Sequence, residues 1–166
     1  MAITNGTYLM VLLLIVHQDA MRSNYDKSAE AIGSSVGGLS TKIHAKVDSF
    51  GQLVNILITP GQVHESQVAN EVWANEPCEF LLADKAYDID SFRQALTEDG
   101  IQAVIPSKRN RLNPTTHDCH IYKERNIVER FFQKIKRFRR IATRYDKTAR
   151  MYLAGVMFVS ILLALK

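Results

Sequence analysis

The chain has 166 residues, of which 46% are hydrophobic and 23% are charged, and its formal net charge is +4. This composition is typical of one globular domain with a buried core, and it excludes an intrinsically disordered chain. Two cysteines, Cys78 and Cys119, lie far apart. They do not form a disulfide framework, which favours a reducing, cytoplasmic location.

The positive charge is concentrated in the C-terminal third of the chain. Between Ser107 and Arg150 lie 14 of the 21 Lys and Arg residues, but only 4 of the 17 Asp and Glu residues. A basic region on an otherwise acidic body indicates a surface for a polyanion, most simply nucleic acid. The alternative is a solvated basic helix, which the aromatic residues among the charges disfavour. We expect the region from Lys108 to Arg150 to bind nucleic acid in a salt-dependent, largely non-specific manner.

An apolar run opens the predicted structure. Tyr8–Val16 is too short to span a bilayer, and its apolar residues on both faces favour a buried central strand. The segment from His17 to Leu39 is polar and rich in Ser and Gly, so it is predicted to be a flexible loop.

A hairpin is predicted next. Thr41–Asp48 alternates apolar and polar residues, which predicts a half-exposed strand with Lys42, His44 and Lys46 on its polar face. A short turn separates it from a second strand, Leu53–Thr59.

Helices and strands then alternate. His64–Ala74 is a predicted helix, and Glu79–Ala83 is a short buried strand that ends at Asp84. A helix is expected over Asp90–Glu98 because an acidic residue begins it and Asp-Gly follows it. Ile101–Ile105 is predicted to be a further strand.

The C-terminal third is expected to contain one loop and two helices. Residues 107–120 are basic, polar and contain proline, which predicts a mobile loop, and a helix follows from Tyr122 to Lys136. Met151–Leu165 is apolar and is interpreted as a core helix, with a membrane anchor as the alternative. The whole order predicts one α/β domain over residues 1–166 with a mixed sheet flanked by helices.

The helix from Tyr122 to Lys136 has two opposed faces. At about 100° per residue, one face carries polar groups and the other is apolar. The polar face carries Tyr122, Arg125, Glu129 and Lys136. The apolar face carries Ile127, Val128, Phe131, Ile135 and Phe138.

Two carboxylates stand out as candidate catalytic and metal-binding groups, Asp84 and Glu129. Mg²⁺ prefers hard oxygen ligands, and two such ions about 4 Å apart can clamp the oxygens of a phosphoryl displacement. Tyr122, Arg125 and Lys136 lie where they can contact phosphates of a bound strand. The alternatives are an ordinary amphipathic helix with an ion pair between Arg125 and Glu129, and an aspartate that only caps the next helix.

The spacing Tyr122-x2-Arg125-x3-Glu129-x6-Lys136 resembles the Y-R-E-K signature of bacterial DDE transposases, specifically the insertion sequence five group. Leu82–Asp88 is similar to the segment that carries the second catalytic Asp in this group, with Ala86 in place of a glycine. Gly37–His44, Thr59–Gln62 and Arg139–Lys147 are also similar to segments of the group.

This resemblance implies an RNase H-like fold, DNA strand cleavage and transfer with Mg²⁺ (or Mn²⁺), and three acidic residues. It makes Asp84 the second acid and Glu129 the third, and these two the metal ligands. Tyr122, Arg125 and Lys136, with Arg139 and Arg140, are the DNA-binding residues that we expect. The resemblance implies that the partner is DNA, both the ends of the element and the target, and that no membrane is involved. By analogy with the family, it also implies a homo-oligomer that assembles on DNA.

The first acid of the triad is missing. Relatives carry it on the first strand just before the position of His17, where this chain reads Leu12–Val16. We consider three explanations: an out-of-frame or rearranged start, a fragment whose upstream part is encoded separately, or substitution by another acid, Asp19 or Asp48. We favour the first.

The helical DNA-binding region usual before the domain is also not found. We therefore expect a transposase catalytic domain with impaired strand cleavage, and the alternative is a catalytically inert DNA-binding remnant.

Overall fold

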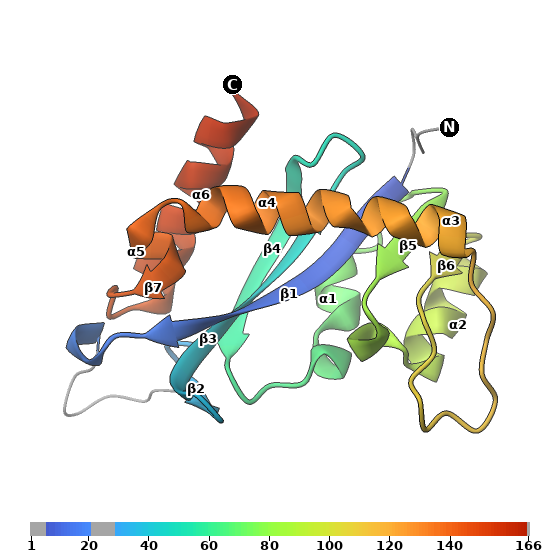
Figure 1. The fold of residues 1–166 in the computed structure, drawn as a ribbon, viewed down its shortest axis with the longest axis horizontal. Coiled ribbons are helices and arrows are strands. Elements are labelled where there is room, and N and C mark those ends of the chain that lie inside the picture. Colours follow the sequence, from blue (N-terminus) through green and yellow to red (C-terminus); the bar gives the residue numbers. More distant parts are fainter. Residues whose placement is uncertain (1–5, 21–28, 166) are drawn as a thin grey trace.

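The structure, a computed structural model, describes residues 6–20 and 29–165. One seven-stranded mixed sheet forms its centre, and helices cover both faces (Figure 1). The strands run β2-β3-β1-β5-β6, with β4 paired to β3 and β7 paired to β1. The predicted α/β class with a mixed sheet is confirmed.

Strand β1 (Gly6–Val16) lies in the middle of this sheet. It pairs antiparallel with β3 (Gly38–Val47) and parallel with β5 (Phe80–Ala83). The last register pair with β5 joins Leu9 to Ala83. The next residue on each strand, Met10 on β1 and Asp84 after β5, therefore lies at the edge where β5 ends.

The hairpin predicted from the sequence is present as β3 and β4 (Leu53–Pro60). The preceding segment is not only a loop, because β2 (Gly33–Ser35) pairs with the start of β3. The prediction of a loop over His17–Leu39 is wrong for that part. Residues 21–28 of the predicted loop lie outside the described residues.

The polar face of β3 is buried, so the prediction of a half-exposed strand is wrong. A 3-10 turn (Glu65–Gln67) and helix α1 (Ala69–Trp73) cover it. The fully buried Nζ of Lys46 donates to the carbonyl oxygen of Trp73 at 2.8 Å and to Glu76 at 3.0 Å. Polar residues alternate on this strand because they have buried partners, not because the face meets water.

Each face of the sheet has its own core. On one face α4 (Asn126–Lys136) and α6 (Ala149–Ala164) pack over β1 and β3. On the other face, α1 and α2 (Asp90–Glu98) pack over β5 and β6 (Gln102–Val104) (Figure 1). The helix that carries Glu129 therefore lies across the same face of β1 as Met10, which packs against that core.

The helix predicted over Tyr122–Lys136 is confirmed and begins slightly earlier. It runs through α3 (Cys119–Tyr122), a 3-10 turn (Lys123–Arg125) and α4. Val128, Phe131 and Ile135 are buried as predicted, together with Phe132. Phe138 lies beyond the end of α4 and is 37% exposed, so its assignment to the apolar face is wrong.

The C-terminal segment is held by a buried arginine. α5 (Arg139–Ala142) leads into β7 (Thr143–Arg144), and α6 follows. Arg144 is fully buried, donates to Thr41 Oγ1 at 2.8 Å, and lies 5.1 Å over the Tyr152 ring. None of the helices in the described part of the chain is long and apolar enough to cross a membrane.

A buried histidine on β3 predicts how stability depends on pH. The ring nitrogens of His44 lie 2.9 Å from Thr59 Oγ1 and 3.3 Å from the Tyr87 hydroxyl. Burial lowers the pKa of His44 from 6.5 to about 4, with the nearby charge of Glu65 opposing this shift and that of Lys42 adding to it. The unfolded chain therefore takes up a proton near pH 6.5 that the folded chain does not, and stability falls below that pH.

We expect the free energy of unfolding to fall by about 2 kcal/mol between pH 7.5 and pH 5.0. Urea denaturation over this range measures it. The His44→Gln variant lacks the titrating group, so its stability should change little over the same range. Equal losses in both proteins would contradict the assignment.

Candidate functional site

Asp84 lies at the carboxyl end of β5, where the chain leaves the sheet. Its Oδ1 accepts a hydrogen bond from the Lys85 backbone N–H at 2.6 Å, and so caps the short turn that follows (Lys85–Tyr87). The side chain stays partly exposed. Asp84 therefore does cap the turn that follows it, as the simpler alternative predicted. Only Oδ1 takes part in this cap, and Oδ2 does not.

The polar face of the long helix forms a compact cluster. Arg125 Nη2 donates to Glu129 Oε1 at 2.5 Å, and the Arg125 guanidinium lies 5.3 Å from the centre of the Tyr122 ring. The ion pair expected between Arg125 and Glu129 is therefore present. Both side chains are partly exposed, at 20% and 39%.

The structure brings Asp84 close to this cluster. Burial raises the pKa of Tyr122, the guanidinium of Arg125 lowers it, and the carboxylates of Asp84 and Glu129 raise it further. The strand register places Asp84 next to Met10, whose sulfur lies 3.8 Å from Arg125 Nη1 in this cluster. A strand end and a helix far apart in sequence thus supply carboxylates to one site.

The other expected DNA-binding residues lie outside this cluster. Lys136 follows Glu129 by seven residues, about 10 Å along the helix, and is exposed. Arg139 and Arg140 lie on α5 and are also exposed, and Arg140 Nη2 is 3.2 Å from Asp146 Oδ1. These three cations extend the charged surface away from the two carboxylates.

Met10 occupies the place on β1 that faces this cluster. Its sulfur is 3.8 Å from Arg125 Nη1. The register places it beside Asp84, two residues before the Leu12–Val16 stretch where the resemblance predicts the first acid. The sequence analysis missed this position because strand register is set by pairing with β5, which no local pattern on β1 specifies.

The two alternative acids considered for the first position, Asp19 and Asp48, both make other contacts. Asp19 lies in a 3-10 turn after β1, 3.3 Å from the ring of His17. The strand between Met10 and Val16 alone spans about 20 Å, which keeps Asp19 away from Asp84. Asp48 accepts hydrogen bonds from the backbone N–H groups of Phe50 and Gln52, each at 2.9 Å, and holds the β3–β4 turn.

The donor set beside β1 does not fit a complete site for Mg²⁺. Asp84 and Glu129 offer hard oxygen ligands, but Arg125 holds Glu129, and Met10 adds only a soft thioether. Within residues 6–20 and 29–165, no group of three His, Cys, Asp or Glu side chains is placed to hold a metal ion.

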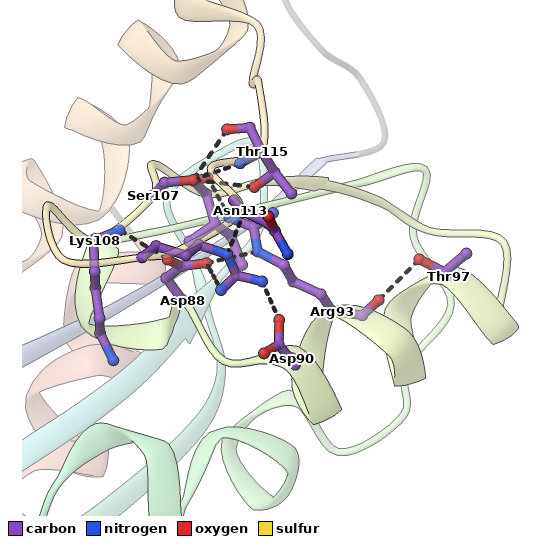
Figure 2. A network of polar contacts seen from close by, with 10 residues as sticks. Asp88, Asp90, Arg93, Thr97, Ser107, Lys108, Asn113 and Thr115 are labelled. Atoms are coloured by element: carbon purple, nitrogen blue, oxygen red, sulfur yellow. Dashed lines mark hydrogen bonds and ion pairs between the residues drawn. The ribbon is translucent and has the colours of Figure 1, made fainter.

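A second carboxylate after β5, Asp88, was missed by the sequence analysis. Its side chain is 1% exposed, and its Oδ1 accepts from Arg93 Nε at 2.7 Å and from Arg111 Nη1 at 2.8 Å. Its Oδ2 accepts from the Lys108 backbone N–H at 2.8 Å (Figure 2). Burial raises the pKa of Asp88, but these donors outweigh that effect and hold it below its usual value. The only feature of the sequence that pointed to Asp88 was its place in the Leu82–Asp88 segment.

This network connects the basic loop to the carboxyl end of β5. Arg111 also contacts Asp90, at the start of α2. Farther along, Ser107 Oγ donates to the Thr115 carbonyl oxygen at 3.0 Å and accepts from its N–H at 2.9 Å (Figure 2). The predicted mobility of residues 107–120 remains a prediction, but the structure joins the beginning of the loop to a buried charge.

We expect Asp88→Ala to lower the free energy of unfolding by about 3–5 kcal/mol, because it leaves two largely buried guanidiniums without their carboxylate. The matched control is Asp90→Ala, which removes an 89% exposed partner of the same Arg111 and should cost less than about 1 kcal/mol. Chemical denaturation of both variants measures the difference. Similar losses would mean that Asp88 does not anchor the loop.

Comparisons with known proteins agree with the expected family. Residues 17–163 match the transposase DDE domain family. Over 121 residues the chain is 36% identical to a protein described as a transposase for insertion sequence element IS6501 of Brucella ovis, covering 71% of this chain and 92% of that protein. Over 69 residues it is 35% identical to the corresponding protein of IS402 from Burkholderia cepacia, covering 42% and 30% respectively.

The fold is similar to that of a much larger protein. A cryo-EM structure of the piggyBac transposase synaptic complex with hairpin DNA aligns with a TM-score of 0.56 and 12% identity, over 95% of this chain and 46% of the other. The RNase H-like fold is thereby confirmed. The chain spans less than half of the piggyBac chain and 30% of the IS402 protein. The family match begins at His17, so β1 lies before it. Membership of the insertion sequence five group remains a prediction.

Proposed function

The chain belongs to the DDE transposase family of insertion sequences, and on this premise we propose that it binds DNA through its basic C-terminal third while its strand cleavage is impaired. The observation that carries this proposal is Met10, which lies beside Asp84 and within 3.8 Å of Arg125 on the face of β1 that α4 covers. Family members generally use divalent metal ions for DNA cleavage and transfer. A thioether at this point supplies no hard ligand.

We assign roles to the remaining residues as part of this proposal. Asp84 and Glu129 are the two retained acids that would hold Mg²⁺ or Mn²⁺. Tyr122 and Arg125 support DNA phosphate beside them, and the exposed cations Lys136, Arg139 and Arg140 extend the contact along the strand. Salt-dependent binding needs only these charges, so it does not require the missing acid.

Arg125 explains why loss of one acid affects more than one ligand. In this chain its guanidinium bridges Glu129 and the sulfur of Met10. A carboxylate at position 10 would compete with Glu129 for this guanidinium, which would leave Glu129 freer to bind a cation. With Met10 present, the ion pair between Arg125 and Glu129 has no such competitor.

A carboxylate at position 10 should make the stability of the chain depend on a divalent metal ion. We expect Met10→Asp to be about 1–3 kcal/mol less stable than the natural chain in EDTA, because it places an additional carboxylate beside two others. Mn²⁺ should reverse this loss, by about 2.7 kcal/mol at a metal concentration 100 times the dissociation constant.

Thermal unfolding with EDTA and with Mn²⁺ measures this effect, and Met10→Asn is the control of matched shape without the charge. The asparagine variant should show little response to Mn²⁺. If the aspartate and asparagine variants respond alike, position 10 is not the missing ligand position.

The same carboxylate at position 10 should also increase DNA cleavage. On plasmid DNA that carries the ends of the element, with Mg²⁺ or Mn²⁺, Met10→Asp should nick at least about 100-fold faster than the natural chain. Adding Asp84→Ala to Met10→Asp should abolish the gain. If the natural chain cleaves as fast as Met10→Asp, and Asp84→Ala abolishes that cleavage, the proposed impairment is wrong.

A second candidate function is an inert DNA-binding remnant of a transposase. The contact between Arg125 and Glu129 at 2.5 Å favours it, because the pair is satisfied without a metal. The same assay separates the two candidates. The remnant requires that the natural chain and its Asp84→Ala variant give the same rate while both still bind DNA.

A further inference from the structure

A cavity of about 290 Å³ lies beside Asp84, between the turn after β5 and the start of the basic loop. We propose that this cavity binds a backbone phosphate of a DNA strand whose path also passes Asp84. The proposal rests on the DNA binding proposed above and adds a defined phosphate site to it. The residues that line the cavity are Asp84, Lys85, Ala86, Lys108, Arg109 and Asn110.

The chemistry of the lining selects an anion. It brings together two ammonium groups, a guanidinium and an amide against a single carboxylate. That carboxylate already accepts a hydrogen bond from the Lys85 backbone N–H. In the described part of the chain no ion pair involves Lys85, Lys108 or Arg109, whereas Arg93 and Arg111 are both paired with Asp88. Cations without a carboxylate partner form strong, charge-assisted hydrogen bonds to phosphate.

The buried network keeps these cations in place. The Lys108 backbone N–H binds Asp88, while its side chain extends away from that carboxylate (Figure 2). The Arg111 N–H donates to the Lys108 carbonyl oxygen at 3.1 Å and closes the turn between them. Arg109 and Asn110 are the two residues inside this turn. Fixing the turn before DNA arrives reduces the entropy lost on binding.

The location of the cations around Asp84 indicates that the anion is a nucleic-acid strand. Lys85, Lys108 and Arg109 line the cavity with Asp84, and on the other side the register places Met10 next to Asp84, with its sulfur 3.8 Å from Arg125 Nη1 on the long helix. A single small anion would use one side only. A nucleic-acid strand carries phosphates at regular intervals, so it can place one phosphate in the cavity and another beside Arg125.

Fluorescence anisotropy with a labelled duplex, between 50 and 200 mM salt, tests the site in the full chain. We expect the double variant Lys108→Ala/Arg109→Ala to bind roughly three- to tenfold more weakly at 0.1 M salt, with the slope of log K against log salt reduced in magnitude by about 1–2. The charge-matched control is Lys134→Ala/Arg150→Ala, which removes two exposed cations that do not line the cavity. Its loss should be smaller.

Amide signals in NMR spectra locate the contact independently. A short duplex should shift the signals of Lys85, Ala86 and residues 108–110 more than those of residues 148–150. Equal losses from the two double variants, or no preferential shift around the cavity, would overturn the phosphate site while leaving DNA binding intact. No binding by the natural chain would overturn the proposed function as well.

Discussion

Pairing of β1 between β3 and β5 is the constraint on which the rest of the structure depends. It is the central strand of the sheet, it supplies apolar residues to the cores on both faces, and its register with β5 fixes which residue lies beside Asp84. Backbone hydrogen bonds impose this register whatever the side chain is. The same pairing that completes the fold therefore places Met10 at the site.

Fold and chemistry make different demands on this strand. An apolar strand satisfies the sheet and both cores, so a sequence without an acid can still form β1. The family match covers residues 17–163, and β1 ends at Val16, just before it. A carboxylate at position 10 would weaken the apolar packing, and only a bound cation would compensate for that cost.

Many of the basic residues have structural roles, so formal charge overstates the surface available to DNA. Arg144 is buried against Thr41 and Tyr152, and Arg111 is held by Asp88. Exposed cations lie along the long helix, on α5, around the cavity beside Asp84 and near the start of α6.

The sequence by itself determined the α/β class, the order of the main elements, the helix bearing Glu129 and the strand that ends at Asp84, because period, turn residues and motif spacing are local properties. The sequence wrongly predicted an exposed polar face on β3. An alternation of polar and apolar residues does not show whether a polar side chain such as Lys46 meets water or buried partners such as Trp73 and Glu76. Tertiary structure alone decided that Met10 faces Arg125 and that Asp88 anchors the basic loop. Both depend on contacts between segments far apart in the chain, and such contacts leave no local pattern in the sequence.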